Sequence, residues 1–267
     1  MGTILFIESL PLTQHKNIWL AMRPERQSEA GVNDALNFTA QFGVSELTSK
    51  LLGLRAAEAY CQRLPAFDGL AACVDRVIID RGLRIDHIKE AARRIPEKGA
   101  LLVTANHPTG ILDGAVLLCA LLSRRSDVWI VANDLLCKIP VLGECVIPIE
   151  KTDLHDAGGY RALLRVRRAW KRNECVVVFP AGTVAHWQWK TMTVSDAPWT
   201  TGIQNFAATL NVVECRATIT VGNPLWFHVC AAVSRKARLA FLLRAFLSTR
   251  GARPTHPVAF NCLNDSA

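Results

Sequence analysis

Short apolar runs alternate with amphipathic segments along the chain from residue 100 onward. Compact apolar runs bounded by turn-forming residues indicate buried strands, and these fall at residues 100–105, 128–132, 144–149, 174–179 and 213–221. Apolar residues at helical spacing predict helices at 112–123, 158–172, 199–210 and 225–248, the last with a break near Ser234. Because strands alternate with helices, we expect an α/β domain with a largely parallel sheet flanked by helices.

The part of the chain before residue 100 carries a weaker pattern. Helical spacing at 44–63 and around 70–77 predicts helices, and Asp86 predicts the N-cap of a further helix over 87–95. Residues 1–40 contain prolines and polar stretches that indicate loops or a poorly packed extension. We therefore expect an extension with helices at 1–84, a central domain at 85–250 and a C-terminal tail at 251–267.

The charge of the chain is positive and unevenly placed. The 267 residues carry a formal net charge of +8, with basic clusters in the predicted helix 158–172 and near the C-terminus at 235–253. Such clusters favour an anionic partner, either nucleic acid or a membrane surface, or they form an ordinary solvated face. No zinc-finger spacing or RNA-binding aromatic pattern accompanies them, so we expect a membrane surface and no nucleic acid.

Apolar residues make up 50% of the chain, but no run approaches the roughly 18 to 20 uninterrupted apolar residues of a spanning helix. The apolar N-terminal stretch lacks a basic leading segment, so a signal peptide is not expected. The nine cysteines form no CxxC pair and no zinc-type spacing, and most lie in apolar runs. We expect buried free thiols in a reducing cytosol, and no metal site.

The residues after the apolar run 100–104 bring an imidazole and a carboxylate into one turn. His107 and Asp113 are separated by five residues, and on an unbroken helix they would lie on different faces. Pro108 disfavours a helical His107, and Gly110 lets the backbone fold back before the next helix. The turn would direct Asp113 at His107, where a carboxylate on one ring nitrogen supports a proton on the imidazole. A capped helix start with an incidental histidine is the alternative.

A second predicted strand ends in the turn Phe179-Pro180-Ala181-Gly182-Thr183. Proline and glycine turn the backbone sharply there, so main-chain amides can face a ligand. An ordinary exit from a strand into a loop is the alternative. In parallel sheets ligands bind beyond the carboxyl ends of the strands, so we expect both turns at one rim of the sheet.

Four motifs in this order resemble the glycerolipid acyltransferase superfamily, and more narrowly its branch of hemolysin-like and ornithine-lipid acyltransferases. The resemblance covers roughly residues 85 to 250. The motifs are Asn106-His107-Pro108-x-Gly110-x-x-Asp113-Gly114, Phe179-Pro180-Ala181-Gly182, Asp196-x-Pro198-Trp199 and Val221-Gly222-Asn223-x-x-x-Phe227.

The resemblance implies a mixed, largely parallel sheet flanked by helices, with an N-terminal helical extension and peripheral or monotopic attachment to the cytoplasmic face of a membrane. It implies transfer of a fatty acyl group from acyl-CoA or acyl carrier protein to a lipid acceptor, without a further cofactor. His107 matches the family's catalytic histidine and Asp113 its partner. Substrate-binding positions are expected at Asn106, Gly110, Lys151, Phe179, Pro180, Ala181, Gly182 and Thr183.

These residues predict a mechanism without an enzyme nucleophile. His107 would act as general base on the acceptor's hydroxyl or amine, which then attacks the thioester carbonyl directly. Donors near the turn 179–182 would stabilise the oxyanion. The chain has no Gly-x-Ser-x-Gly elbow, no HExxH and no glycine-rich phosphate loop.

Two positions depart from the pattern of the glycerophospholipid enzymes. Ala181 stands where a glutamate is usual, and Val184 where an arginine is usual. In that family the glutamate and the arginine help to bind the acceptor's phosphate. We therefore expect a lyso-ornithine-lipid type of acceptor, without a terminal phosphate. A 1-acylglycerol-3-phosphate acyltransferase, a hydrolase that uses water or a cysteine, and a non-catalytic hemolysin-like membrane-binding protein are the alternatives.

Overall fold

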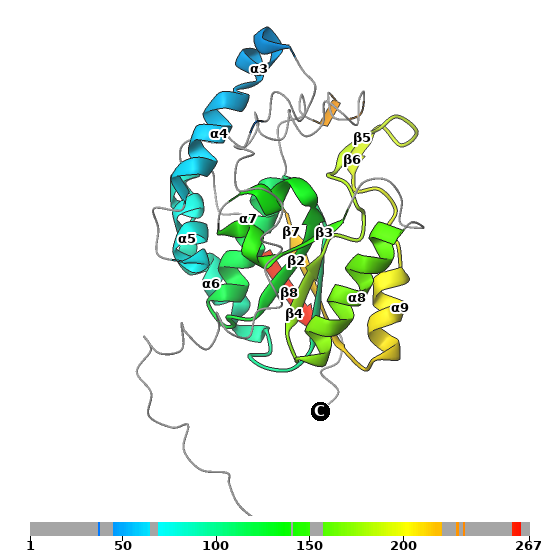
Figure 1. Ribbon diagram of the computed structural model, residues 1–267. Helices are drawn as coiled ribbons and strands as arrows, with labels where there is room; N and C mark the ends of the chain where they lie inside the picture. Colours follow the sequence, from blue (N-terminus) through cyan, green and yellow to red (C-terminus); the bar gives the residue numbers. More distant parts are fainter. Residues whose placement is uncertain are drawn as a thin grey trace, which may run out of the picture. The chain divides into compact units, whose positions relative to one another are not determined.

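A six-stranded sheet forms the core of the part of the protein that the structure describes (Figure 1). The computed structural model describes residues 37, 45–64, 69–139, 141–149, 157–220, 228–229, 232 and 258–262. The strand order is β3-β2-β4-β1-β7-β8, and all neighbours are parallel except β7 and β8. The strands are β1 (Leu101–Ala105), β2 (Val128–Asn133), β3 (Val146–Ile149), β4 (Cys175–Val178), β7 (Val213–Ile219) and β8 (Val258–Cys262).

Helices cover both faces of the sheet, because alternate residues of its central strands point to opposite sides. Leu101 and Val103 of β1 pack with buried residues of one helical layer, and Leu102 packs with those of the other. The two layers lie on either side of the sheet in Figure 1. They are α5 (Leu70–Asp80), α6 (Ile85–Ala91) and α7 (Ile111–Leu122) on one face, and α8 (Ala157–Lys171) and α9 (Gly202–Thr209) on the other.

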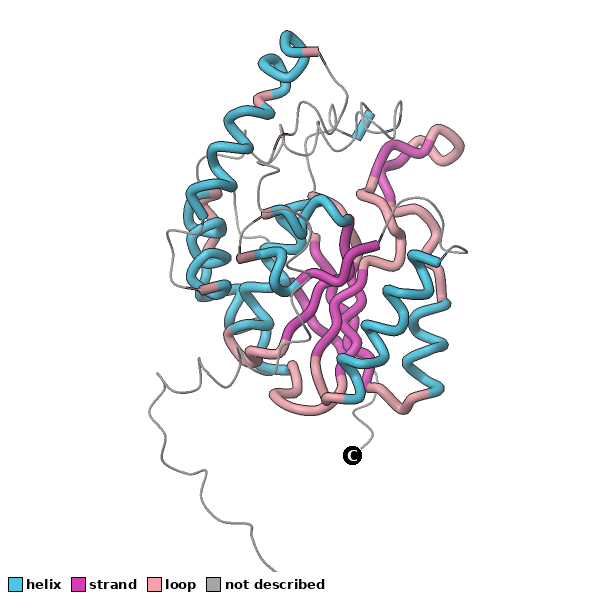
Figure 2. Tube along the Cα trace, in the orientation of Figure 1, coloured by secondary structure: helices cyan, strands magenta, loops and turns pink. Residues whose placement is uncertain are grey.

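Smaller elements surround this layered core. A second apolar cluster joins α4 to α5 and to the short helix η3, through residues such as Leu54, Val77 and Leu135. A two-stranded hairpin stands apart from the six-stranded sheet, as Figure 2 shows. These elements are α3 (Glu46–Leu52), α4 (Leu54–Arg63), η2 (Ala92–Arg94), η3 (Asp134–Lys138), η4 (Leu142–Cys145), β5 (His186–Gln188) and β6 (Thr193–Ser195).

The predicted fold class is confirmed, and the five predicted strands correspond to β1, β2, β3, β4 and β7. The prediction for Asp86 is wrong: Arg84 is the N-cap of α6, and Asp86 lies in its first turn, where a carboxylate still favours the helix dipole. The helix predicted from 199 begins at Gly202, because Trp199 and Thr200 are engaged in side-chain and main-chain bonds of the preceding loop. Most of the helix predicted at 225–248 lies outside the described residues.

Three strands escaped prediction from the sequence. Strands β5 and β6 are short and mostly polar, so no apolar run marks them. Strand β8 pairs antiparallel with β7, with Cys215 opposite Cys262 and Ile219 opposite Val258. Residues 258–262, within the stretch that we expected to form a tail, therefore provide an edge of the sheet.

A buried arginine joins the segments that lead into the strands at the amino edge of the sheet. The side chain of Arg125 is fully buried and pairs through Nε and Nη2 with both carboxylate oxygens of Asp127, at 2.9 and 2.8 Å. Its guanidinium also donates to the carbonyls of Pro96, Gly99 and Asn173. These carbonyls precede β1 and β4, so one planar side chain fixes the start of the central strands.

Candidate active site

The site begins where β1 ends. The side-chain amide of Asn106 donates to the carbonyl of Ile219 and accepts its N–H, both at 2.7 Å, and so continues the pairing of β1 with β7 by a side chain. The next residue, His107, donates its own N–H to the carboxylate of Asp196 at 3.2 Å. Its carbonyl accepts the N–H of Ala185 at 2.8 Å. The backbone of His107 is therefore held by two segments that are distant in the sequence.

Asp113 is held by the turn that precedes α7. Its side chain is fully buried, and Oδ2 accepts the main-chain N–H groups of Thr109 and Gly110, each at 2.8 Å. The hydroxyl of Thr109 donates to Oδ1. Gly110 has φ 79° and ψ −114°, a conformation that other residues rarely adopt. Because the carboxylate lies at a helix N-terminus and accepts these bonds, its position is well defined.

The turn brings His107 and Asp113 together. Nδ1 of His107 lies 2.9 Å from Oδ2 of Asp113, but the oxygen is off the direction of an Nδ1–H bond, so the two atoms are in close contact without an aligned hydrogen bond. Catalytic contacts of this kind often tighten only when substrate is bound. The His107 side chain is 17% exposed, which leaves the imidazole within reach of a ligand.

Phe179 forms one wall beside the imidazole. Its ring stacks on that of His107 with centroids 4.0 Å apart and an interplanar angle of 26°. The residues after Phe179 form the predicted turn, in which Gly182 adopts φ 62° and donates its N–H to the carbonyl of Phe179 at 2.9 Å. The amide of Gly182 is thus used inside the turn, and the expectation that donors near this turn stabilise an oxyanion stays a prediction.

The other residues of this turn have structural neighbours of their own. The carbonyl of Pro180 accepts the main-chain N–H of Thr200 at 3.2 Å and its hydroxyl at 3.1 Å. Val184, at the position where the resemblance led us to look for an arginine, is buried. The turn is therefore locked onto the loop before α9, and Phe179 is the residue of the turn that the structure places against His107.

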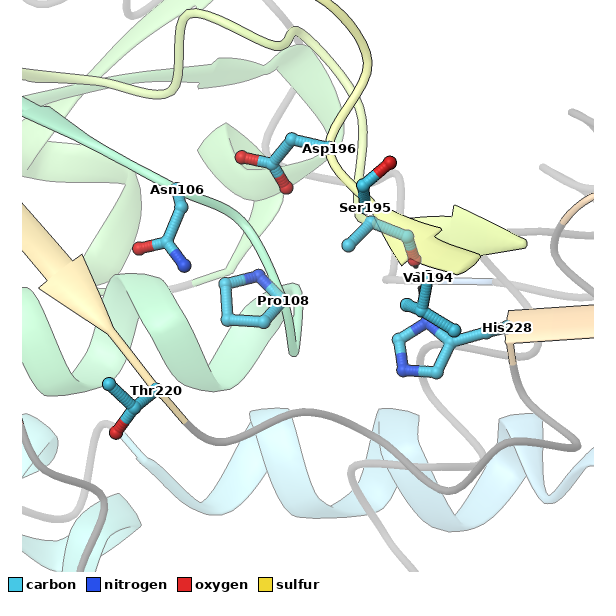
Figure 3. Close-up of a pocket in the computed structure, with 8 residues that line it drawn as sticks. Asn106, Pro108, Val194, Ser195, Asp196, Thr220 and His228 are labelled. Atoms are coloured by element: carbon cyan, nitrogen blue, oxygen red, sulfur yellow. Dashed lines mark hydrogen bonds between the residues drawn. The ribbon is translucent and has the colours of Figure 1, made fainter. Parts of the chain in front are cut away.

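An open pocket of ≈ 380 Å³ lies at this rim, lined by the residues on either side of His107 but not by His107 itself (Figure 3). Asn106 and Pro108, the two neighbours of His107, form part of its wall, and the carboxylate of Asp196 forms another part. Asp196 also accepts the indole N–H of Trp199 at 3.1 Å. The described residues that line the pocket are Asn106, Pro108, Ala185, Val194, Ser195, Asp196, Thr220 and His228.

Several of these pocket residues were not predicted. Asp196 belongs to one of the recognised motifs, and its acidic side chain was the available signal. His228 is buried, with Nδ1 2.7 Å from the carbonyl of Ala185, but a lone histidine in an apolar segment gives no signal of a site. Ser195 and Thr220 reach the pocket only through the tertiary fold.

Among the described residues, no lysine or arginine lines this pocket. Lys151 lies outside the described residues. Arg161 and Arg165 are exposed on α8, and neither lines the pocket. Within the described ranges, no group of three His, Cys, Asp or Glu side chains is placed to hold a metal ion.

Five cysteines of the described region have a raised thiol pKa and are therefore poor nucleophiles. Burial raises the pKa of the Cys175 thiol to about 12, and burial together with the carboxylate of Asp75 raises that of Cys119 to about 12. Cys137 is exposed, but desolvation and the nearby Asp134 raise its pKa as well. A cysteine needs a lowered pKa to act as a nucleophile at neutral pH.

The geometry therefore combines a fixed carboxylate, a partly exposed imidazole and an adjacent pocket, an arrangement that is able to accept and return a proton. A family model described as acyltransferase matches residues 63–243, which is more than half of the chain. No curated protein sequence matches the chain. The matched region includes both turns of the site and every strand from β1 to β7. The chain belongs to this acyltransferase family, and it is an enzyme that transfers acyl groups.

Proposed function

We propose that the enzyme transfers a fatty acyl group from acyl-CoA or acyl carrier protein to a lyso-lipid without a terminal phosphate, of the lyso-ornithine-lipid type. The observation that carries this proposal is the contact of His107 with the buried Asp113, in a turn where the neighbours of His107, Asn106 and Pro108, line an open pocket. The order of motifs that resembles the ornithine-lipid branch supports the same assignment.

In this reaction His107 is the general base. With a proton on Nδ1 facing Asp113, Nε2 carries the lone pair and takes the proton of the acceptor's hydroxyl as its oxygen attacks the thioester carbonyl carbon. The carbon–sulfur bond then breaks, and the imidazolium returns the proton to the leaving thiolate. Asp113 stabilises the imidazolium between these two steps, and its own position is maintained by Thr109 and Gly110.

The charge of the pocket supports an acceptor without a phosphate. Of the described residues that line the pocket, Asp196 is the one acidic residue, and none is a lysine or an arginine. A carboxylate repels the anionic phosphate monoester more strongly than an ornithine headgroup, in which an ammonium group balances the carboxylate. The buried Val184 cannot take the role of the arginine that binds phosphate in related enzymes.

A lipid acceptor also requires access to a membrane, and we propose that the enzyme works at the cytoplasmic face as a peripheral or monotopic protein. The net charge of +8 supports attraction to anionic lipid. Arg161, Arg165, Arg167 and Arg168 are all exposed on α8. In the part of the chain that the structure describes, none of the helices has the length and apolar character needed to cross a bilayer.

The test offers purified enzyme acyl-CoA and acyl carrier protein donors, with lyso-ornithine lipid and lysophosphatidate as parallel acceptors. We expect the higher kcat/KM with lyso-ornithine lipid, and Asp196→Asn should reduce that preference because it removes the charge but keeps an acceptor for the His107 N–H. His107→Ala is the inactive control. A higher kcat/KM with lysophosphatidate would identify a 1-acylglycerol-3-phosphate acyltransferase, and release of free fatty acid alone would identify a hydrolase.

A further inference from the structure

The hairpin of β5 and β6 has no role in the proton transfer described above, yet it is joined directly to the pocket. Val194 and Ser195 of β6 line the pocket, and Asp196 follows them. The other end of the hairpin, residues 189–192, is a turn that lies away from the six-stranded sheet (Figure 2). The turn is therefore connected to the pocket by two short strands.

The two sides of this hairpin differ in polarity. Trp187 and Val194 face each other across the strands, and the ring of Trp189 meets that of Trp187 edge-on, with centroids 6.2 Å apart. The opposite side is polar, because the cross-strand pairs His186–Ser195 and Gln188–Thr193 alternate with the pair Trp187–Val194. The side-chain contact between Gln188 and His186 at 3.2 Å lies on this polar side.

Apolar exposure is concentrated at the tip of the hairpin. Trp189 and Met192 are each 62% exposed, and Val194 is 37% exposed. The other exposed large apolar side chains of the described region are distributed over α3, α5, α8 and the end of α9, and scattered single residues of this kind are normal. Trp189, Met192 and Val194 lie within six residues of the hairpin and together form an exposed apolar surface.

The conformation of Met192 is a second, independent observation. It has φ 54°, in the left-handed region, and its N–H donates to the carbonyl of Gln188 at 2.8 Å to close the turn. Glycine and asparagine are the usual residues at such a position, because a side chain is strained there. A large apolar side chain is therefore placed in solvent at a position where folding alone favours glycine.

The charge of the hairpin is positive. Lys190, at the tip, is its only charged residue, and the chain contains no aspartate or glutamate between Glu174 and Asp196. Tryptophan is enriched at the boundary between lipid headgroups and acyl chains, where its ring is apolar and its N–H is polar. Lysine beside it adds attraction to anionic headgroups.

We propose that residues 189–192 of this hairpin insert into the interface of an anionic bilayer and hold the pocket against the lipid surface. The proposal rests on the proposed function, since a lipid acceptor must pass from the bilayer to the pocket. With the tip in the headgroup layer, Val194 extends the apolar surface from the membrane to the pocket wall. A bilayer fits the combination of an aromatic ring, a flexible apolar side chain and a lone cation on a narrow projection.

The experiment measures flotation of the purified full chain with vesicles of phosphatidylcholine alone and of phosphatidylcholine with phosphatidylglycerol. The test variant is the double substitution Trp189→Ser with Met192→Gly, in which glycine suits the left-handed turn and so protects the fold. Ile79→Ser removes an apolar side chain that is 55% exposed on α5, and it is the matched control. Circular dichroism melting compares the folding of all three proteins.

We expect the double variant to lower partitioning onto the anionic vesicles by about tenfold or more, because two apolar side chains no longer leave water. The control should bind as the wild type does, and Lys190→Glu should weaken binding to anionic vesicles only. Equal binding by the wild type and the double variant, or failure of the wild type to bind, would overturn the proposal. A change of oligomeric state in the double variant on sedimentation would overturn it in favour of a second copy of the chain.

The same proteins separate this inference from the proposed function. Turnover of a detergent-dispersed acceptor does not need a bilayer, so the double variant should keep wild-type turnover in detergent and lose it on vesicles. Binding to vesicles that depends on the hairpin, together with no acyl transfer to either lyso-lipid, would refute the proposed acceptor and leave the membrane surface in place. Turnover that is lost equally in detergent and on vesicles, with the fold intact, would refute the membrane role of the hairpin.

Discussion

The two ends of the central strands each hold a cation-forming side chain next to an aspartate, but the two pairs are built differently. At the amino edge, Arg125 makes five hydrogen bonds, two to Asp127 and three to main-chain carbonyls, and its side chain is fully buried. At the carboxyl rim, Asp113 is equally buried, while the imidazole of His107 is 17% exposed and its Nδ1 is not aligned with the carboxylate.

The difference separates a structural pair from one that is able to react. Every part of the Arg125 guanidinium is engaged, and arginine does not release its proton in proteins, so this pair can only maintain the fold. At the rim the carboxylate is fully bound, by Thr109 and Gly110, whereas the imidazole stacks on Phe179, is partly exposed and is of the side-chain type that exchanges a proton near neutral pH. The proposed mechanism needs both a carboxylate in a fixed position and an imidazole that can take up and release a proton.

The sharpest way to test the comparison is to remove the imidazole. His107→Ala should lower kcat by about 10²- to 10⁴-fold, because the general base is lost. Asp113→Asn should lower it by a similar factor through loss of imidazolium support and tautomer control. Initial rates of acyl transfer measure both effects, and the melting temperature of His107→Ala should stay near that of the wild type. Near wild-type turnover by His107→Ala would contradict the proposed mechanism.

The amino edge should respond in stability and not in chemistry. Arg125→Met leaves Asp127 without its partner and deprives three carbonyls of a donor, and we expect it to lower the free energy of unfolding by about 3–5 kcal/mol. Denaturant unfolding measures this loss, and kcat per folded molecule should be unchanged. The neighbouring Arg124 pairs with Glu97 at 3.1 Å with both side chains partly exposed, so Arg124→Ala should cost less than about 1 kcal/mol. Equal losses for the two arginines would refute the structural role of Arg125.

Asn106 lies at the carboxyl rim, but its side-chain nitrogen and oxygen are both hydrogen-bonded, as the Arg125 guanidinium is at the amino edge. Asn106→Ala removes both bonds to Ile219 and should lower the free energy of unfolding by about 1–3 kcal/mol. Since His107 is the next residue, kcat should fall as well, with less change in KM. Paired unfolding and steady-state measurements test this, and loss of stability with unchanged kcat would show that Asn106 does not position the histidine.

The smallest effect is expected from two buried thiols, Cys119 in α7 and Cys175 at the start of β4. The raised pKa values of Cys119 and Cys175, about 12 for each, keep both thiols protonated at pH 7.5, and burial blocks reagents. Iodoacetamide at this pH should therefore leave both residues unmodified in peptide mass maps of the folded protein. Guanidine-unfolded protein is the control in which both are alkylated, and labelling of Cys175 in the folded state would contradict this account.

The sequence by itself determined the features that depend on neighbouring residues. Apolar periodicity identified five strands and the helices between them, because burial of one face imposes the spacing of apolar side chains. The turn from His107 to Asp113 was also predictable, since Pro108 and Gly110 restrict the backbone locally and the partners are close in the chain. The N-cap at Asp86 was wrong because capping signals locate helix ends only within a few residues.

Only the tertiary structure decided which distant segments complete the site. Asp196 reaches the backbone of His107 across 89 residues, and Asn106 reaches Ile219 across 113. The edge strand β8 likewise depends on where the chain returns to pair with β7, and β5 and β6 of the hairpin are too short and too polar to indicate strands by themselves. Contacts of this kind are selected by packing of the whole sheet and not by local backbone preference, so periodicity does not contain them.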